Sequence, residues 1–269
     1  MEMEIAGYIT AAFIGILLGT MGGGGSILTV PMLVYLFRMQ PAYATSYSLF
    51  IVGFTSLTGA MGNYLKGLVH IRTAILFGLS SFITVFAVRK WVMPVIPETI
   101  VQTPYFVLTQ SALTMILFAL LMVVAAISML QNKNKESKNS DTVHAQLPVV
   151  KLLLYGTGIG IVTGLLGAGG GFLLIPVLVL LLHLPMKEAV GTSLLIISIN
   201  SLIGFAGDIG HYSIEWRRLL LITTISVAGI FAGVALSQKI SAQKLKKAFG
   251  WFVLLMGIFI LAKEIMYQS

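Results

Sequence analysis

The chain of 269 residues contains no cysteine and few charged residues, which narrows what it can be. Without cysteine, disulfide bridges and thiolate metal sites are excluded, although the cellular compartment stays undetermined. Only 10% of the residues are charged and 57% are hydrophobic, and the mean hydropathy is +0.97. A soluble domain needs a more polar surface, so this composition is typical of a polytopic membrane protein.

Several common functional motifs are also missing. The four histidines and nine acids show no metal-ligand spacing. The glycine clusters lack the GK[ST] ending of a phosphate-binding loop and follow no strand of a βαβ unit. The basic residues that give the chain its net charge of +8 lie in short loops between apolar runs, and basic residues in such loops set membrane topology. We therefore expect no metal, no cofactor, no nucleic-acid partner and no ATP-driven transport within this chain.

The apolar sequence divides into segments that predict an all-α polytopic membrane protein. The N-terminal MEME is acidic and lacks the basic region of a signal peptide, so we expect the first apolar segment to be retained. Ten apolar segments are separated by short polar gaps, and they cover residues 5–21, 27–37, 43–65, 73–88, 105–130, 152–166, 172–182, 189–209, 219–236 and 245–262.

A glycine-rich interruption occurs twice inside the apolar sequence. The first copy reads GTMGGGGS over residues 19–26 and is closed by Pro31; the second reads GLLGAGGG over residues 164–171 and is closed by Pro176. A helix broken at this depth loses backbone hydrogen bonds that lipid cannot replace, so the break has to be buried in protein or line a cavity. Paired interruptions of this kind are typical of transporter binding sites.

The apolar segment after each interruption is too short to cross a membrane alone. Segments 27–37 and 172–182 each contain 11 residues. As a helix such a segment reaches about 17 Å at a rise of 1.5 Å per residue, whereas the hydrocarbon core is about 30 Å thick. We therefore predict that each half contains a short helix hairpin broken by glycine, and the sequence leaves open whether the hairpin spans or re-enters.

The two interruptions belong to an internal repeat. At an offset of 145 residues, residues 15–72 align without a gap to residues 160–217, and about a third of the positions are identical. The polar stretch between the halves has no apolar periodicity and is typical of a flexible linker. We predict a first transmembrane repeat over residues 1–130, a linker over 131–148 and a second repeat over 149–269.

Each repeat contains five segments, an odd number, so the second repeat enters the membrane from the opposite side. The two halves are then inverted about a pseudo-two-fold axis in the membrane plane. Eleven Lys and Arg residues lie in the loops on the linker side, against six on the other side. Because basic loops stay in the cytoplasm, we expect a cytoplasmic linker and both termini outside.

The glycine-rich breaks suit the binding of an anion. The first N–H groups of a helix have no internal partner, and the helix dipole gives them partial positive charge. Two-fold symmetry would bring the two half-helix starts face to face, and nearby hydroxyls would complete the site. The predicted substrate-binding residues are Gly22, Gly23, Gly24, Gly25, Ser26, Ser48, Gly167, Ala168, Gly169, Gly170, Gly171, Thr192 and Ser193. Candidates for proton binding or gating are Asp208, His211 and Glu215.

These motifs resemble the sulfite exporter TauE/SafE-like family of membrane permeases, over nearly the whole chain. The resemblance rests on GTMGGGGSILTVPMLV, its echo GLLGAGGGFLLIPVLV, the AxxxSL and AVGTSL segments that follow, and the pattern ending at Arg72. It implies a bacterial or plant membrane carrier of small sulfur-containing anions such as sulfite, sulfoacetate and related organosulfonates, and we expect a location in the inner membrane of a bacterial cell. The family often has an acid at the positions of His70 and Glu215, and only the second repeat keeps it.

We predict that the chain is no enzyme but a secondary carrier that works by alternating access. A channel-like anion path is an alternative within transport. An intramembrane hydrolase would use Ser26 as nucleophile and His70 or His211 as base, but the second repeat has Gly171 in place of the serine. In a membrane scaffold protein that transports nothing, the paired breaks would have no function. The expected partners are a small anion and membrane lipids; the coupling ion and a homo-oligomeric state stay open.

Overall fold

The structure is a computed structural model that describes the backbone of residues 2–92, 95, 97, 99–103, 106–131, 149–166, 171–208 and 214–268. The predicted linker, apart from its first residue, lies outside the described residues. Nearly all of the described residues are helical, as expected for a polytopic membrane protein.

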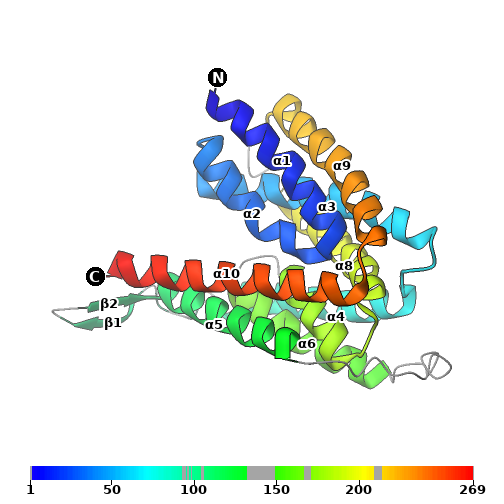
Figure 1. Cartoon of the computed structure of the whole chain (residues 1–269). Coiled ribbons are helices and arrows are strands. Elements are labelled where there is room, and N and C mark those ends of the chain that lie inside the picture. The colour runs from blue at the N-terminus through cyan, green and yellow to red at the C-terminus, as the bar shows by residue number, and fades with distance from the viewer. Residues whose placement is uncertain are drawn as a thin grey trace.

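Helices follow one another along both halves of the chain (Figure 1). The first half contains α1 (Glu2–Met21), the 3₁₀ helix η1 (Gly22–Gly25), α2 (Ser26–Pro31), the π-helix η2 (Met32–Leu36), α3 (Pro41–Tyr64), α4 (Ile71–Ala87), the π-helix η3 (Val88–Val92), β1 (Thr99–Thr103), β2 (Phe106–Thr109) and α5 (Gln110–Gln131). The second half contains α6 (Val149–Leu166), α7 (Gly171–Pro176), the π-helix η5 (Val177–Leu181), α8 (Met186–Asp208), α9 (Trp216–Lys239) and α10 (Ala242–Gln268).

The short segment after each break has the same construction in both halves. Pro31 ends α2 and Pro176 ends α7, and in each case the next five residues form a π-helix. Proline has no N–H and its ring crowds the preceding turn, which disturbs the regular ladder of hydrogen bonds. Together, α2 with η2 and α7 with η5 match the two predicted short segments to within one residue.

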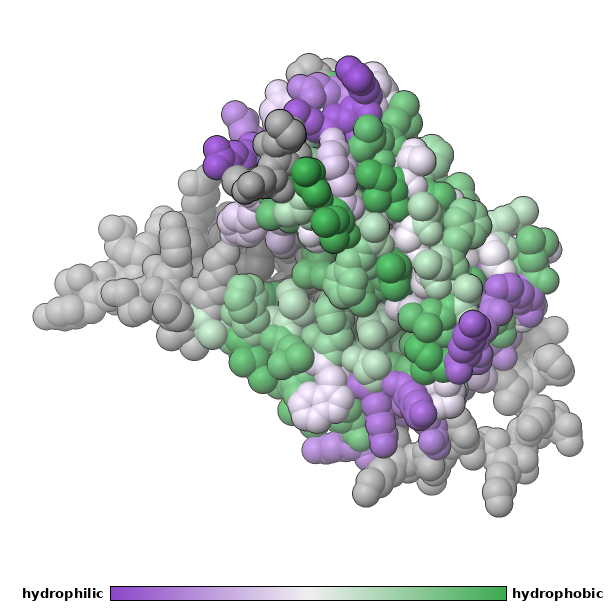
Figure 2. Space-filling model, turned by 45° about the horizontal axis from the view of Figure 1, so that its top comes forward, coloured by the Kyte–Doolittle hydropathy of each residue, from purple (hydrophilic) through white to green (hydrophobic). Residues whose placement is uncertain are grey.

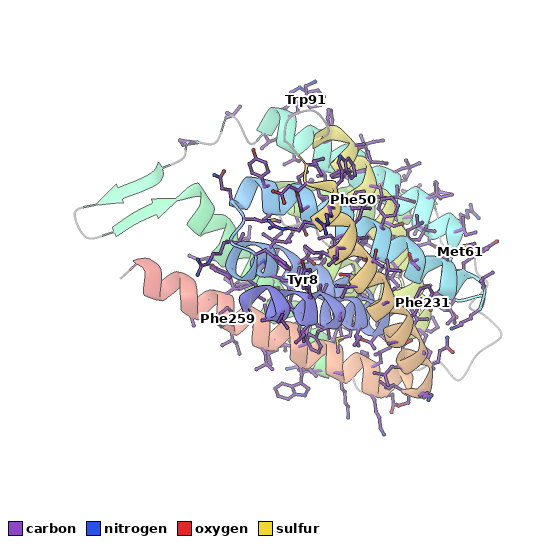
Figure 3. All side chains as sticks on the ribbon, turned by 90° about the horizontal axis from the view of Figure 1, so that it is seen from above. Tyr8, Phe50, Met61, Trp91, Phe231 and Phe259 are labelled. Carbon is purple, nitrogen blue, oxygen red and sulfur yellow. The ribbon has the colours of Figure 1, made fainter. Side chains whose placement is uncertain are left out.

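The outside of the helical bundle is apolar. By length and composition, four described helices are able to cross a membrane, over Ile71–Val92, Met186–Ala206, Trp216–Lys239 and Ala242–Ala262. Met61, Phe231 and Phe259 project outward in Figure 3, and each is more than half exposed. Figure 2 shows a broad apolar face between groups of hydrophilic residues. Exposed apolar surface of this extent is expected where lipid surrounds the protein.

The helices pair across the two halves of the chain. α1 packs along α9 and α4 packs along α6, whereas α3 pairs with α8 and α5 pairs with α10 (Figure 1). Thus the first α-helix of each half packs along the fourth α-helix of the other half. The third α-helices of the two halves pair with each other, and so do the fifth. The core between these pairs includes Phe77 on α4 and Phe249 on α10, both fully buried.

Glycine lets two of these pairs approach closely. A Cβ built on Gly15 of α1 would collide with the carbonyl oxygen of Ser226 on α9. A Cβ on Gly160 of α6 would lie 2.6 Å from the carbonyl oxygen of Ser81 on α4. Small residues at such crossings allow the backbones of membrane helices to come into contact. The two contacts join equivalent positions, so the α1/α9 and α4/α6 pairs are built alike.

One part of the fold differs from the sequence-based expectation. Residues 105–130 read as one apolar segment, but β1 and β2 form an antiparallel hairpin with Thr103 opposite Phe106, and α5 begins only at Gln110. Figure 1 shows this hairpin projecting from the bundle. The two strands, TIVQT and FVLT, are rich in β-branched and aromatic residues, which favour an extended backbone. The all-helical prediction therefore holds for the bundle and fails for this connection.

We expect Gly229→Ala to destabilise the protein, because the added Cβ would collide with the Ala12 carbonyl oxygen where α9 meets α1. Overpacking of this kind costs about 1–3 kcal/mol. The control is Gly158→Ala, whose Cβ would meet nothing within 4 Å; it should leave stability unchanged or raise it by up to about 1 kcal/mol. Size-exclusion chromatography after heating in detergent measures both variants, and equal midpoints would contradict the expectation.

Candidate functional site

The first glycine-rich break is a tight helical turn. α1 ends at Met21, Gly22 has a φ of +68°, and Gly22–Gly25 form one turn of 3₁₀ helix. A residue with a Cβ is strained at this φ, which explains the need for glycine. The turn continues directly into α2, and the Ser26 N–H donates to the Gly23 carbonyl. The first N–H groups of this helical run therefore belong to the glycine turn itself.

This turn lies directly against the second half of the chain. A Cβ on Gly22 would lie 2.5 Å from Ser193 Oγ and 3.3 Å from the Cα of Val190, both on α8. It would also lie 2.6 Å from Ile175 Cδ1 on α7. Glycine is thus required at this position by the approach of two other helices as well as by its own backbone. The described glycines of the turn are buried in protein, as a break within a membrane has to be.

The starts of the two half-helices also come together. Ser26 begins α2 and Gly171 begins α7, and a Cβ on Gly171 would lie 2.8 Å from Ser26 Oγ. These residues occupy equivalent positions in the two repeats. The Ser26 hydroxyl donates to the Gly23 carbonyl at 2.7 Å. A side chain at position 171 would therefore crowd the Ser26 hydroxyl.

Three of the predicted site hydroxyls, on Ser48, Thr192 and Ser193, are buried, and Ser26 is partly buried. Ser193 has no exposed surface, and its Oγ donates to the Val190 carbonyl at 2.9 Å. Ser48, its equivalent on α3, is 7% exposed. Thr192 is engaged elsewhere, because its Oγ1 accepts a hydrogen bond of 3.0 Å from the His70 N–H. Ser193 therefore faces the glycine turn, while Thr192 holds the loop before α4.

The remaining predicted residues lie apart from this meeting point or outside the described residues. Residues 167–170 of the second break and His211 are outside them. Asp208 ends α8, and only its backbone is described. Glu215 precedes α9, with an exposed side chain whose Oε2 lies 3.4 Å from Arg218 Nη1. The Glu215 N–H donates to the Tyr47 hydroxyl at 2.7 Å.

Some polar groups within the bundle were not singled out as binding residues. Thr55 Oγ1, Ser56 Oγ and Asn200 Oδ1 are buried without a hydrogen-bond partner in the described structure. Asn200 Nδ2 donates to Ser81 Oγ at 3.3 Å. Thr55 and Asn200 lie on α3 and α8 at the repeat offset, which also marks them in the sequence as an equivalent pair.

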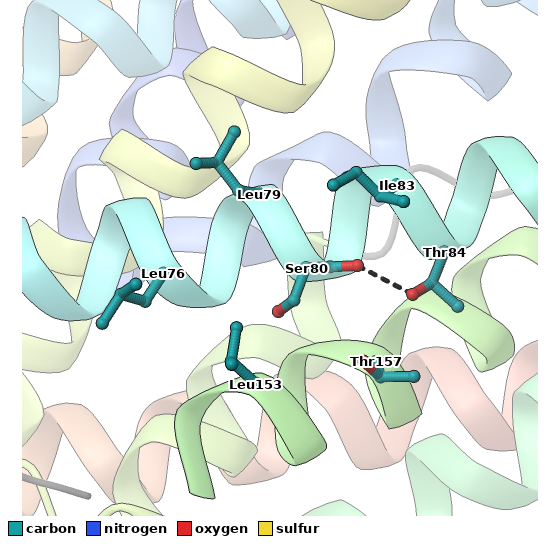
Figure 4. A pocket seen from close by; sticks show the side chains of 7 residues that line it. All are labelled: Leu76, Leu79, Ser80, Ile83, Thr84, Leu153 and Thr157. Carbon is teal, nitrogen blue, oxygen red and sulfur yellow. Dashed lines mark hydrogen bonds between the residues drawn. The ribbon is translucent and has the colours of Figure 1, made fainter. Parts of the chain in front are cut away.

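A groove of about 390 Å³ lies elsewhere, between α4 and α6 (Figure 4). Leucine and isoleucine line most of it, with Ser80, Thr84 and Thr157 as the polar side chains. Thr84 Oγ1 donates to the Ser80 carbonyl at 2.8 Å, as the dashed line in Figure 4 shows. This groove is apart from the meeting point of the two half-helices and contains none of the predicted binding residues.

The described residues at the meeting point offer only neutral groups. The described site residues are glycines and hydroxyl residues, and none carries an ionised side chain. Among the described residues, no three His, Cys, Asp or Glu side chains come together as a metal site would require. The groups present are backbone amides and hydroxyls, and backbone N–H groups at a helix start are of the kind that binds anions.

Comparison with known proteins decides the family. The family model described as sulfite exporter TauE/SafE matches residues 8–260. The chain belongs to this family. A "probable membrane transporter protein" of Xylella fastidiosa (strain Temecula1) is 26% identical over 259 residues, covering 94% of this chain and 92% of the relative.

Two further relatives carry similar names. The "probable membrane transporter protein YdhB" of Bacillus subtilis is 24% identical, covering 87% of this chain and 91% of the relative. A probable membrane transporter protein of Methanocaldococcus jannaschii is 36% identical over 115 residues, covering 40% of this chain and 43% of the relative. No solved structure matches the chain. The family and its relatives indicate a membrane transporter, not an enzyme.

Gly171→Ser should destabilise the protein, because its side chain would be forced against Ser26 Oγ. The double variant Gly171→Ser with Ser26→Gly moves the single hydroxyl to the other half and should recover most of the loss. For residues in contact, coupling energies of about 0.5–3 kcal/mol are usual. Thermal midpoints of the wild type, both single variants and the double variant give this coupling. Additive effects would show that the two positions do not meet.

Proposed function

We propose that the protein is a secondary transporter of a small sulfur-containing oxyanion, such as sulfite, sulfoacetate or a related organosulfonate. The anion binds in mid-membrane to backbone amides at the starts of the two half-helices, and the carrier works by alternating access. The observation that carries this proposal is the contact of the first glycine turn and Ser26 with α8 and Gly171 of the other half. The substrate class follows from the family.

Equivalent local structures support an inverted pair of repeats. Arg38 and His183, at equivalent positions, both have a positive φ, of 54° and 53°. The His70 N–H donates to Thr192 Oγ1, and at the equivalent position the Glu215 N–H donates to the Tyr47 hydroxyl. A backbone N–H of the first half thus donates to a hydroxyl of the second half, and the equivalent N–H of the second half donates to a hydroxyl of the first. We assign residues 1–130 and 149–269 to the two repeats.

The free energies involved favour backbone amides over a buried basic side chain as the group that binds the anion. A charged residue at the centre of a membrane helix costs about 2.5–3.5 kcal/mol or more. A helix N-terminus contributes about 0.3–2 kcal/mol to an anion. Two such termini give moderate binding, which suits a carrier that has to release its cargo on the other side. Alternating access then follows as a movement of one repeat against the other around the shared site.

The orientation in the membrane follows from the loop charges. We place the linker at 131–148 in the cytoplasm and both termini outside, in the inner membrane of a bacterial cell. The end of the α3/α8 pair that carries Lys66 and Lys187 then faces the cytoplasm, and the end with Arg38 and Arg217 faces outward.

An intramembrane serine hydrolase finds little support. The Ser26 hydroxyl donates to the Gly23 carbonyl, whereas the imidazole of His70 pairs with Glu188. In the described structure, these two contacts leave Ser26 and His70 without the dyad that a nucleophile and its base require.

Purified protein in proteoliposomes tests the proposed function directly. Sulfite, thiosulfate, sulfate, sulfoacetate and chloride are offered in parallel, with protein-free vesicles as the control. We expect uptake of at least one sulfur oxyanion, faster than chloride, and acceleration when the same anion is present on the opposite side. Acceleration distinguishes a carrier from a channel-like path. Uptake of none of the five anions would reject the proposal.

Ser26→Ala should weaken transport without abolishing it, because backbone donors remain. Loss of one hydrogen bond worth about 0.5–1.5 kcal/mol raises the half-saturating anion concentration by roughly two- to tenfold. Ser80→Ala, in the groove between α4 and α6, is the matched control and should transport as the wild type does. Complete loss of transport in well-folded Ser26→Ala would instead indicate that the hydroxyl is indispensable.

A further inference from the structure

A histidine–glutamate pair joins the two halves at one end of the α3/α8 pair. His70 Nε2 lies 2.6 Å from Glu188 Oε2. His70 directly precedes α4 in the first half, and Glu188 lies in the first turn of α8 in the second half. The side chains are 36% and 26% exposed, so water reaches the pair from this end of the bundle.

Further contacts seat the loop before α4 on the same two turns of α8. The His70 N–H donates to Thr192 Oγ1 at 3.0 Å. Gly191 makes room for the loop, because a Cβ there would collide with the Leu68 carbonyl oxygen. Glu188 and Thr192 are one helical turn apart and therefore lie on the same face of α8. That face holds the loop.

The neighbouring face of these turns contacts the candidate anion site. Val190 and Ser193 of α8 lie against Gly22 of the first glycine turn. The loop before α4 and the glycine turn are thus held by the same short stretch of one helix. A movement of this stretch of α8 would therefore act on the loop and on the glycine turn together.

At the other end of the α3/α8 pair, a backbone N–H again donates to a hydroxyl of the other half, but no charged pair joins the halves there among the described residues. The Glu215 N–H donates to the Tyr47 hydroxyl at 2.7 Å. The Glu215 carboxylate is 67% exposed and interacts with Arg218 of its own helix at 3.4 Å. Only the end with His70 joins the halves through an imidazole and a carboxylate in the described structure.

We propose that the His70–Glu188 pair is the closing contact of the transporter's mouth at this end, and that it makes closure of this mouth dependent on pH. The inference rests on the proposed function. A protonated imidazole and a carboxylate form a charge-assisted hydrogen bond, which is roughly twice as strong as a neutral one. Histidine changes its charge between pH 5 and 8. This mouth is therefore held more firmly in acid.

The other charged side chains at this end are basic in the described structure: Lys66 in the loop, Arg72 on α4, Lys151 on α6, Lys187 on α8, Lys239 on α9, and Lys244, Lys246 and Lys247 at the start of α10. Lys187 Nζ donates to the Gln238 carbonyl, so it is directed toward α9. Glu188 is the one described acid near His70 at this end.

Transport by the wild type, His70→Gln and Glu188→Gln is measured in proteoliposomes from pH 5.5 to 8.0. Each rate is divided by the wild-type rate at the same pH, so that protonation of the anion cancels. We expect this ratio to rise at least threefold toward acid for both variants. The matched control is His183→Asn, which removes an exposed imidazole before α8 and keeps a residue that tolerates positive φ. Its ratio should stay constant.

Because the chain has no cysteine, the mouth can also be locked reversibly. His70→Cys with Glu188→Cys is bridged by a short bis-methanethiosulfonate reagent and released by dithiothreitol. Bridging should lower transport at least tenfold, and release should restore it. Leu130→Cys with Gly250→Cys bridges α5 and α10, where a Cβ on Gly250 lies 3.0 Å from Leu130. This control bridge should leave transport largely intact.

Unchanged ratios in both single variants, or full transport by the bridged pair, would overturn the inference while wild-type anion transport still supported the proposed function. If the wild type itself moves none of the anions, the proposed function fails and the inference fails with it. The two failures are therefore distinguishable in the same set of vesicles.

Discussion

A membrane offers no water to a broken backbone, and the structure is organised around this constraint. The break after α1 interrupts the regular helix at Gly22. The second half of the chain provides the cover, since α7 and α8 lie directly against Gly22. The first half thus buries its break with the help of the second half. The packing of α1 against α9 and of α4 against α6 also joins the two halves of the chain.

Much of this arrangement could be predicted from the sequence because it depends on strong local signals. Glycine runs followed by proline locate both half-helices to within one residue, and the offset of 145 residues identifies the equivalent positions. The β1/β2 hairpin was not predicted, because a short apolar run does not distinguish strand from helix. The form of the first break was also missed, since a run of glycines permits both an unwound chain and a 3₁₀ turn.

Contacts between distant side chains could not be predicted at all. His70 and Glu188 are separated by more than a hundred residues, and each occurs at a position where the other repeat has a different residue. Alignment of the repeats therefore conceals this pair. Their proximity depends on how the loop before α4 lies on α8, which is set by Gly191 and Thr192. Such a contact needs the tertiary structure.

The meeting of Ser26 with Gly171 has a consequence for any solute held between them. Duplication makes the two backbones alike, but only the first half has a hydroxyl at this position. The meeting point is therefore chemically asymmetric although its surroundings are repeated. Under the proposed function, a cargo with one distinctive substituent would settle in a single orientation and would present different ends to the two faces of the bilayer.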